Sequence, residues 1–325
     1  MTTLAEKLAK RLDGTSLSKE GKPLFFEENR GAHLFANLFS IPEEDCPSFY
    51  EAFKIVTQGQ GEELRKINSL ISSSLLSLLA FYPLFNNTDK NKNIIINGNL
   101  YYKCFFEVKN RVVRRPSCID VVLVSIDEKR MLFLESKLSE YADGLEYSHS
   151  YGKGYKTLYE DYGLFMHAFD GYLKLGDCKD SLVLESPVDK KKIYIEGVKQ
   201  SISHLIGLVQ GPQYWRQGYY PKNYYKEYKN FYDRAEVIEY ATILFDPKEF
   251  EVNIQEFKAY SNLYNNTIVA HGDKILECIA RWSNDAYPKY KKIEVLKKIL
   301  TYQELFSNKH NRPLLIKAVS DFYKL

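Results

Sequence analysis

This sequence contains few cysteines, and neither positive nor negative charge predominates in it. Its 325 residues include only 5 cysteines, which are widely scattered and have no C-x-x-C spacing. Such a set argues against a disulfide framework or a cysteine-based zinc site and favours a reducing compartment, so we expect a cytoplasmic protein. Lys and Arg number 45 and Asp and Glu 42, a net charge of +3. This balance excludes a histone-like polycation, and affinity for nucleic acid would need a local basic patch.

Long hydrophobic runs are also scarce. Residues 2–12 alternate apolar and basic positions without a continuous apolar core, so no secretory signal is visible. One stretch, Ile67–Thr88, has no charged residue, but it contains several Ser and Asn residues and Pro83. At helical spacing its polar residues lie on one side, which predicts a buried amphipathic helix rather than a membrane span. We therefore expect no membrane partner.

Several common catalytic motifs are missing. The 6 histidines have no H-E-x-x-H or H-x-x-x-H spacing, no serine lies in a G-x-S-x-G turn, and no G-x-x-x-x-G-K phosphate loop occurs. These absences exclude the zincin, α/β-hydrolase and P-loop classes of enzyme. His204 lies in the apolar run 198–209, and we interpret it as a core histidine rather than a metal ligand.

The composition is that of a globular protein, with 45% hydrophobic and 27% charged residues. Helices are predicted near 25–39 and 61–82, at 198–210, and over most of the chain after 250. Apolar runs predict strands at 100–113, 118–124, 131–138 and 237–245. This order predicts an α/β fold with a mixed sheet. We expect a first unit at 1–250, with an insertion at about 140–197, and a C-terminal helical extension at 251–325.

Two neighbouring predicted strands each carry one carboxylate. Asp120 lies at the start of the run 118–124, and Glu135 lies near the end of 131–138. If the turn at 126–130 pairs these strands antiparallel, the two carboxylates meet at one edge of the sheet, where their repulsion favours Mg²⁺ or Mn²⁺. Lys137 follows two residues after Glu135 and so lies on the same face. There it can orient a water molecule or stabilise charge on a reacting phosphate.

The tripeptide Glu-x-Lys is not specific by itself, because it occurs at five places in the chain, Glu107-Val-Lys109 among them. Glu135 is preferred because it follows an apolar run and because an Asp begins the preceding apolar run. The nearest Asp upstream of Glu107 is Asp89, which lies in a polar stretch.

This arrangement resembles the PD-(D/E)xK nuclease superfamily, in which a strand Asp precedes a Glu-x-Lys on the next strand. The resemblance covers about residues 25–245, although Ile119 stands where the proline of the family's name would be. It implies a restriction-endonuclease-like α/β fold, with a mixed central sheet flanked by helices and with helical and Tyr-rich elaborations. It also implies that Asp120 and Glu135 hold Mg²⁺ or Mn²⁺, with the Ser136 carbonyl as a third ligand, and that Lys137 positions the attacking water.

Two further positions match the family's pattern. Many members carry a glutamate on a preceding helix; Glu28 fits this position, and Glu27 is the alternative. The following helix often carries Gln-x-x-x-Tyr, and this chain keeps Gln200 but has His204 in place of the tyrosine. Glu28 and Gln200 are therefore expected to complete the catalytic site. A surface glutamate near a helix start and a boundary glutamine of a packed helix are the structural alternatives.

Tyrosine is abundant, with 26 residues against 2 tryptophans. The segments 141–172 and 214–232 are rich in it and show no clear period, so we interpret both as insertions or loop-rich elaborations. Arg216, Lys222, Lys226 and Lys229 alternate with aromatic residues, which suits stacking on bases and binding of phosphates. An oligomer interface, and hence a homodimer, is the open alternative. The run 289–298 is predicted to be a helix with a solvated lysine face.

Together these patterns predict a Mg²⁺- or Mn²⁺-dependent nuclease that hydrolyses phosphodiester bonds, with DNA as the expected substrate. The alternative is a non-catalytic member of the same fold that binds nucleic acid or protein. Catalysis requires the Asp120 and Glu135 carboxylates to reach one ion, so their placement distinguishes the two hypotheses.

Overall fold

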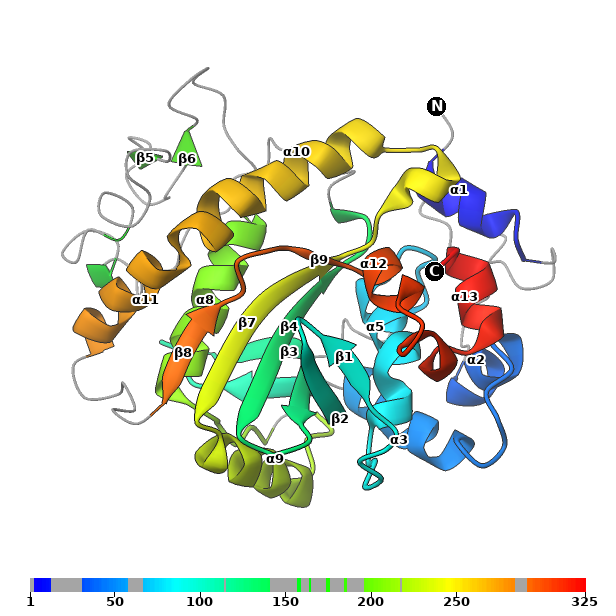
Figure 1. The fold of residues 1–325 in the computed structure, drawn as a ribbon, viewed down its shortest axis with the longest axis horizontal. Helices are drawn as coiled ribbons and strands as arrows, with labels where there is room; N and C mark the ends of the chain where they lie inside the picture. The colour runs from blue at the N-terminus through cyan, green and yellow to red at the C-terminus, as the bar shows by residue number, and fades with distance from the viewer. Residues whose placement is uncertain are drawn as a thin grey trace.

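The computed structural model describes residues 3–12, 31–57, 67–113, 115–140, 196–216, 218–283 and 291–325, with short pieces at 157–158, 164, 174–175 and 184–185. A seven-stranded central sheet crosses the molecule in the order β1-β2-β3-β4-β7-β8, with β9 also beside β7 (Figure 1). Its strands are β1 (Ile94–Ile96), β2 (Asn99–Asn110), β3 (Ser117–Ser125), β4 (Arg130–Lys137), β7 (Val237–Leu244), β8 (Lys292–Val295) and β9 (Leu300–Thr301). A separate small sheet pairs β5 (Lys174–Leu175) with β6 (Leu184–Glu185).

Helices lie on both sides of the central sheet (Figure 1). They are α1 (Leu4–Ala9), α2 (Ala32–Leu38), α3 (Cys46–Thr57), α5 (Ser73–Phe81), α8 (Glu196–Gln210), α9 (Lys222–Arg234), α10 (Ile254–Tyr264), α11 (Ala270–Ser283), α12 (Tyr302–Ser307) and α13 (Lys317–Tyr323). The shorter helical turns are η1 (Tyr82–Leu84), η4 (Pro247–Phe250), the π-helical η5 (Asn265–Val269) and η6 (Arg312–Leu314). None of the helices in the described ranges combines the length and the apolar character that crossing a membrane requires.

The sheet is mixed, as the order of predicted elements indicated. Strands β1 to β4 form an antiparallel series, whereas β7 is parallel to β4, β8 and β9. Antiparallel neighbours need only a short turn, but the parallel step from β4 to β7 needs a long crossover connection, and α8 lies within it. The crossover therefore carries α8 onto the sheet, next to the end of β4.

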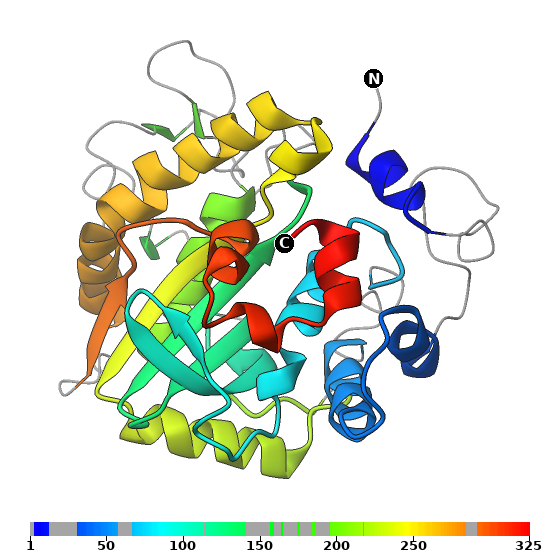
Figure 2. The ribbon, with the colours of Figure 1, turned by 45° about the vertical axis from the view of Figure 1, so that its right-hand side comes forward.

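Strand β4 is buried on both faces. Residues Met131–Lys137 are all buried, which explains the nearly continuous apolar run in its sequence. Helix α5 contacts β3 and β4 on one face. In the turned view of Figure 2, α12 and α13 lie close to α5 although they come much later in the chain, and the rings of Phe81 and Tyr302 join α5 to α12.

The predicted tight turn between β3 and β4 is present. Glu128 adopts a left-handed conformation in it, with φ of 60°. Its carboxylate accepts hydrogen bonds from the Tyr102 hydroxyl at 2.9 Å and from Arg234 at 2.8 Å, and Lys90 lies 3.3 Å away. Partial burial raises the pKa of Glu128, but these hydrogen bonds and positive charges outweigh it and lower the pKa.

Residues 222–234, interpreted above as part of a loop-rich elaboration, form the helix α9. Its buried residues Tyr224, Tyr228, Phe231 and Tyr232 follow helical spacing, so the rings form the apolar face of an amphipathic helix. The earlier interpretation was wrong because the helical period is visible only when tyrosine is counted as an apolar residue. The other Tyr-rich segment, 141–172, lies almost wholly outside the described residues, as does most of the expected insertion at 140–197.

The run 289–298 is also corrected, because residues 292–295 form the strand β8 rather than a helix. Ile293 and Val295 are buried and alternate with Lys292 and Glu294, so a period of two was present beside the helical spacing. Pairing with β7 selects the strand. The segment 251–325 is therefore helical for most of its length but also adds β8 and β9 to the central sheet.

Helix α5 begins later than predicted. The expected helix covered 61–82, whereas α5 begins at Ser73, and the Ser72 hydroxyl accepts a hydrogen bond from the Leu75 backbone N–H at 3.1 Å. A serine in this position caps the helix, because it satisfies a backbone donor that has no partner inside the helix. The first turn of α5 thereby lies close to the end of β4.

Candidate functional site

The predicted pairing of the two carboxylate-bearing strands is confirmed. Strands β3 and β4 are antiparallel, with Val121 opposite Leu134, so Asp120 and Glu135 are the next residues at the same end of the two strands. Asp120 Oδ2 accepts a hydrogen bond from the backbone N–H of Ser136 at 2.7 Å. Asp120, from β3, therefore lies directly against the Glu-Ser-Lys segment of β4.

Lys137 lies between Glu135 and Gln200. Its Nζ donates hydrogen bonds to Glu135 Oε1 at 2.7 Å and to Gln200 Oε1 at 2.8 Å. Glu135 is 1% exposed and Lys137 7%, whereas Asp120 is half-buried. The structure thus brings together four of the predicted residues, Asp120, Glu135, Lys137 and Gln200, which we call the carboxylate–lysine cluster.

Burial and charge act on the ionisable groups of this cluster in different directions. Burial raises the pKa of Glu135, but the neighbouring Lys137 and His204 outweigh it and lower the pKa to about 2. Burial lowers the pKa of Lys137, but Glu135 outweighs it and holds the pKa well above its ordinary value. Burial, and then the charges of Glu135 and Glu107, raise the pKa of Asp120 well above 3.8. Asp120 is therefore the acid in this cluster whose negative charge is least compensated.

His204 is a neighbour of the cluster that the sequence interpretation had assigned to the core. It is buried, with 3% of its surface exposed, and its Nε2 lies 2.9 Å from Glu135 Oε2. Gln200 and His204 are four residues apart on α8, so one face of the helix presents both side chains to Glu135 and Lys137. The four-residue spacing could have placed His204 at the site, because Gln200 was already assigned to the site.

The hydroxyl of Ser136 contacts the opposite layer of helices. Its Oγ lies 2.7 Å from the Tyr302 hydroxyl of α12 and 3.3 Å from the Ser73 carbonyl of α5. Helix α5 thus packs beside the cluster, but its sequence contains no acidic residue. Glu28 and Glu27 lie outside the described residues, so the prediction that one of them completes the site stays a prediction. The same holds for the Ser136 carbonyl as a ligand.

A second Glu-x-Lys lies on the neighbouring strand β2. The pairs Phe106–Val121 and Val108–Ile119 enclose Glu107 and Asp120, so this glutamate reaches the level of Asp120. The Cys118 thiol donates to Glu107 Oε2 at 2.8 Å, and Lys109 Nζ donates to Cys118 Sγ at 3.3 Å. Asp120 therefore lies between two strands that each carry Glu-x-Lys. The sequence analysis set Glu107 aside because it looked for a partner Asp only upstream of each Glu-x-Lys, and Asp120 lies downstream of Glu107.

Three of the predicted nucleic-acid-binding residues lie on α9, and Arg216 precedes this helix. Arg216, Lys222 and Lys226 are exposed, and Lys229 pairs with Asp233 on the same helix. Most of the aromatic residues on α9 face the core and have no free ring face for stacking on bases. The exposed positive charges remain suited to phosphate, but the combined aromatic and basic surface that the sequence suggested is not present on α9.

The described side chains can offer a divalent ion two ligands at a time, but they do not form a complete coordination shell. Within the described ranges, no group of three or more His, Cys, Asp and Glu side chains is arranged to hold a metal ion. Asp120 is nevertheless suited to one, because it is half-buried, carries a poorly compensated charge and uses one oxygen for the Ser136 N–H. Mg²⁺ commonly binds through one or two carboxylates and keeps several waters.

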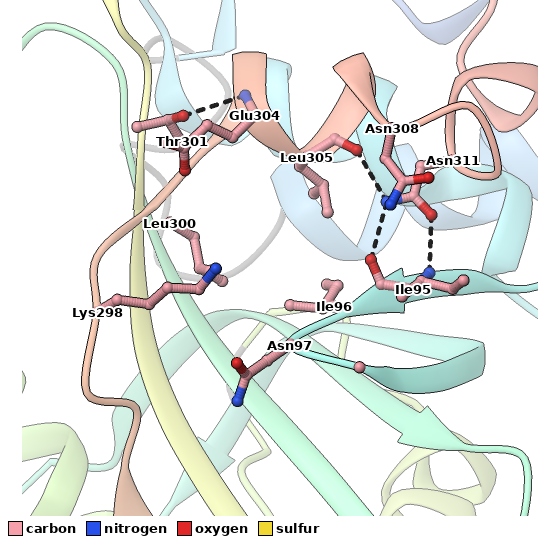
Figure 3. A pocket seen from close by; sticks show the side chains of 11 residues that line it. Ile95, Ile96, Asn97, Lys298, Leu300, Thr301, Glu304, Leu305, Asn308 and Asn311 are labelled. Atoms are coloured by element: carbon pink, nitrogen blue, oxygen red, sulfur yellow. Dashed lines mark hydrogen bonds between the residues drawn. The ribbon is translucent and has the colours of Figure 1, made fainter.

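A cavity of about 360 Å³ lies away from this cluster, between the β1–β2 hairpin, the β8–β9 segment and α12 (Figure 3). Its wall combines the apolar side chains of Ile96, Leu300 and Leu305 with the polar ends of Asn97 and Lys298. The cavity is mixed in character and shares no lining residue with the carboxylate–lysine cluster.

The fold and the cluster define a mixed α/β protein, with an open central sheet flanked by helices and a buried Glu–Lys pair at one end of its central strand. Comparison with protein-family models, curated proteins and solved structures finds no match. The proposal for its function therefore depends on the geometry of the cluster and on the resemblance of its motif.

Proposed function

We propose that this protein is a metal-dependent nuclease that hydrolyses phosphodiester bonds in DNA. The observation that carries the proposal is the position of Lys137, whose ammonium is held by Glu135 and Gln200 while Asp120 lies against the same segment. A buried ion pair is costly to form and is weak evidence for a purely structural role, although removing one partner of it is destabilising. Its arrangement matches the motif Asp120, Glu135-x-Lys137 and the glutamine of the following helix.

The chemistry follows from the charges of these residues. Asp120 and Glu135 would hold Mg²⁺ or Mn²⁺, which supplies Lewis-acid activation of the phosphate. Lys137 donates a hydrogen bond to the attacking water and stabilises the negative charge that develops on the phosphate oxygens. Gln200 accepts a hydrogen bond from Lys137 and so keeps its ammonium directed at the reacting atoms. Exposed Arg216, Lys222 and Lys226 would bind the DNA backbone.

A non-catalytic binding protein is the second candidate function. One observation favours it: Glu135 already has Lys137 at one oxygen and His204 at the other. Such a network is neutralised without a metal ion. In that case the cluster would hold α8 against the sheet, and the exposed lysines or an oligomer interface would carry the function.

A cleavage assay distinguishes these two functions. Supercoiled DNA, single-stranded DNA and RNA would be incubated with the protein, with and without Mg²⁺ or Mn²⁺. Lys137→Met should lower single-turnover cleavage by about 10²-fold or more, the effect of removing one electrostatic stabiliser. Lys297→Met is the matched control, because Lys297 forms an exposed ion pair with Asp273. Normal metal-dependent cleavage by the Lys137 variant would remove it from the reaction.

Metal binding is tested separately from cleavage. Mg²⁺ or Mn²⁺ should raise the melting temperature, because an ion that binds only the folded state stabilises it. The double variant Asp120→Asn, Glu135→Gln should lose this response. Glu294→Gln changes a half-buried acid on β8, away from the cluster, and should keep it. A metal response that persists in the double variant would place the ion elsewhere.

A further inference from the structure

Three tyrosines pack together where the chain enters α9. The ring of Tyr214 lies 6.3 Å from that of Tyr220, at 25° between the planes, and 5.4 Å from that of Tyr225. Tyr220 is buried, whereas Tyr214 is 37% exposed, more than any other tyrosine in the described ranges. Because its neighbours hold the ring in place, Tyr214 presents a fixed aromatic surface to the solvent.

The segment that carries Tyr214 is bonded to the end of the sheet where Asp120 lies. The backbone N–H of Gln213 donates to the Lys109 carbonyl at 2.8 Å, and the Lys109 N–H donates to the Tyr220 hydroxyl at 3.4 Å. Lys109 is paired with Cys118 on β3, two residues before Asp120. With about 4.8 Å between neighbouring strands and about 3.4 Å per residue along a strand, the backbones of Gln213 and Asp120 lie about 12 Å apart. A stacked nucleic-acid strand rises about 3.4 Å per nucleotide, so about four nucleotides span this distance.

The charges around Tyr214 have one sign. Residues 211–226 contain three basic residues and no acidic one. The three basic side chains are exposed, namely Arg216, Lys222 and Lys226. The next acid along the chain, Glu227, pairs with Lys103 at 2.7 Å. A symmetric homodimer through this surface would place the same positive charges opposite each other, whereas a polyanion would neutralise them. The surface therefore fits nucleic acid better than a second copy of the chain.

We propose that Tyr214 stacks on an unpaired base and that the substrate of the nuclease is therefore single-stranded DNA. The inference rests on the proposed function, because it names the form of DNA that reaches the carboxylate–lysine cluster. In a duplex the faces of the bases are covered by their neighbours, so an exposed ring can stack only where the strand is unpaired. The phosphates of such a strand would contact Arg216 and Lys222, and its next few nucleotides would reach Asp120.

The first experiment measures binding of a fluorescent oligonucleotide to the whole chain by anisotropy, without divalent ions, so that no metal-dependent cleavage occurs. Tyr214→Ala should weaken binding of single-stranded DNA about tenfold, the effect of losing one base–aromatic stack, and should change the affinity for duplex DNA by less than about twofold. Tyr214→Phe keeps the ring and should bind like the parent. Leu100→Ala is the matched control, because Leu100 is 39% exposed at the opposite end of β2 from Lys109.

Salt dependence separates the ring from the basic side chains. Stacking releases no counterions, so Tyr214→Ala should leave the slope of log affinity against log salt concentration unchanged. Lys222→Met should reduce this slope by about 0.7, the value for one phosphate contact with a single strand. Parental affinity of Tyr214→Ala for single strands, or an equal loss for duplex DNA, would overturn the proposal.

The second experiment uses the parent protein and does not depend on a variant that folds. A single strand that carries iodouracil should crosslink to Tyr214 on irradiation, as identified by mass spectrometry, and crosslinks to other residues alone overturn the proposal. Cleavage with Mg²⁺ or Mn²⁺ is measured in parallel. Metal-dependent cleavage together with binding that does not involve Tyr214 overturns this inference and leaves the nuclease function intact. Binding through Tyr214 without cleavage of any substrate supports the stacking site and contradicts the nuclease function.

Discussion

The buried pair of Lys137 and Glu135 makes a quantitative prediction about stability. The two charges lie 2.7 Å apart, with side-chain exposures of 9% and 1%. At an effective dielectric constant of about 20, their attraction is about 6 kcal/mol, and the loss of hydration offsets much of it. Removing only the lysine leaves the carboxylate buried with only His204 beside it. We therefore expect Lys137→Met to lower the free energy of unfolding by about 3–5 kcal/mol.

The test is a double-mutant cycle measured by urea unfolding without divalent ions. Glu135→Gln in the Lys137→Met background should restore most of the lost stability, because neither charge is then buried alone. The ion pair of Lys297 and Asp273 has nearly the same distance, 2.7 Å, but its side chains are 61% and 66% exposed. Lys297→Met should change stability by less than about 1 kcal/mol.

Two results would refute this reasoning. Equal effects of Lys137→Met and Lys297→Met would show that burial does not strengthen the pair. A double variant that is less stable than Lys137→Met would show that His204, 2.9 Å from Glu135 Oε2, compensates the charge of Glu135 without the lysine. Circular dichroism and fluorescence should report the same transition with similar slopes, so that differences in midpoint measure differences in stability.

Three further predictions concern the fold around the cluster. Glu128 has a lowered pKa, so its contribution to stability is present above its ordinary pKa of 4.5 and is lost as the pH falls; Glu128→Gln should therefore lose less stability on acidification from about pH 5 to about pH 3. Gly207→Ala would place Cβ 2.8 Å from Asn110 Cβ and closer still to Ser117 Oγ, and should cost about 1–3 kcal/mol in urea unfolding; an unchanged midpoint would contradict close packing of α8 on the sheet. Tyr228→Phe removes a 2.6 Å hydrogen bond to Asn110 and should cost about 1–3 kcal/mol in urea unfolding; an unchanged midpoint would contradict a stabilising role of this hydroxyl.

The central part of the sheet was predictable because its strands are short apolar runs with clear ends. Residues 118–124 and 131–138 are joined by a charged turn, and such a turn leaves only antiparallel pairing. The pairing then brings Asp120 level with Glu135 without further information. Gln200 joined them because its place on the next helix matched the motif. These parts of the site depend on local periodicity and on neighbours in the chain.

Other features were not predictable because two patterns fit the same residues or because the partner is distant. Ile293 suits a helix when it is paired with Leu296 and a strand when it is paired with Val295, and only β7 decides between them. The spacing of Tyr224 and Tyr228 is helical, but the face is apolar only because phenol rings can be buried. The contact of His204 with Glu135 depends on how α8 lies on the sheet, which no local pattern records.

The hydroxyl contact between Ser136 and Tyr302 has a consequence for biosynthesis. Tyr302 comes later in the chain than every strand and helix that contributes to the carboxylate–lysine cluster. Strands β8 and β9, which pair with β7, come shortly before it. A ribosome releases these segments after β1 to β7, and domains fold as units once their segments have emerged. A nascent chain that ends before residue 302 therefore lacks the helix that packs against Ser136, on the face of β4 opposite to Glu135 and Lys137. The contacts of the Ser136 hydroxyl are complete only when synthesis has passed residue 302.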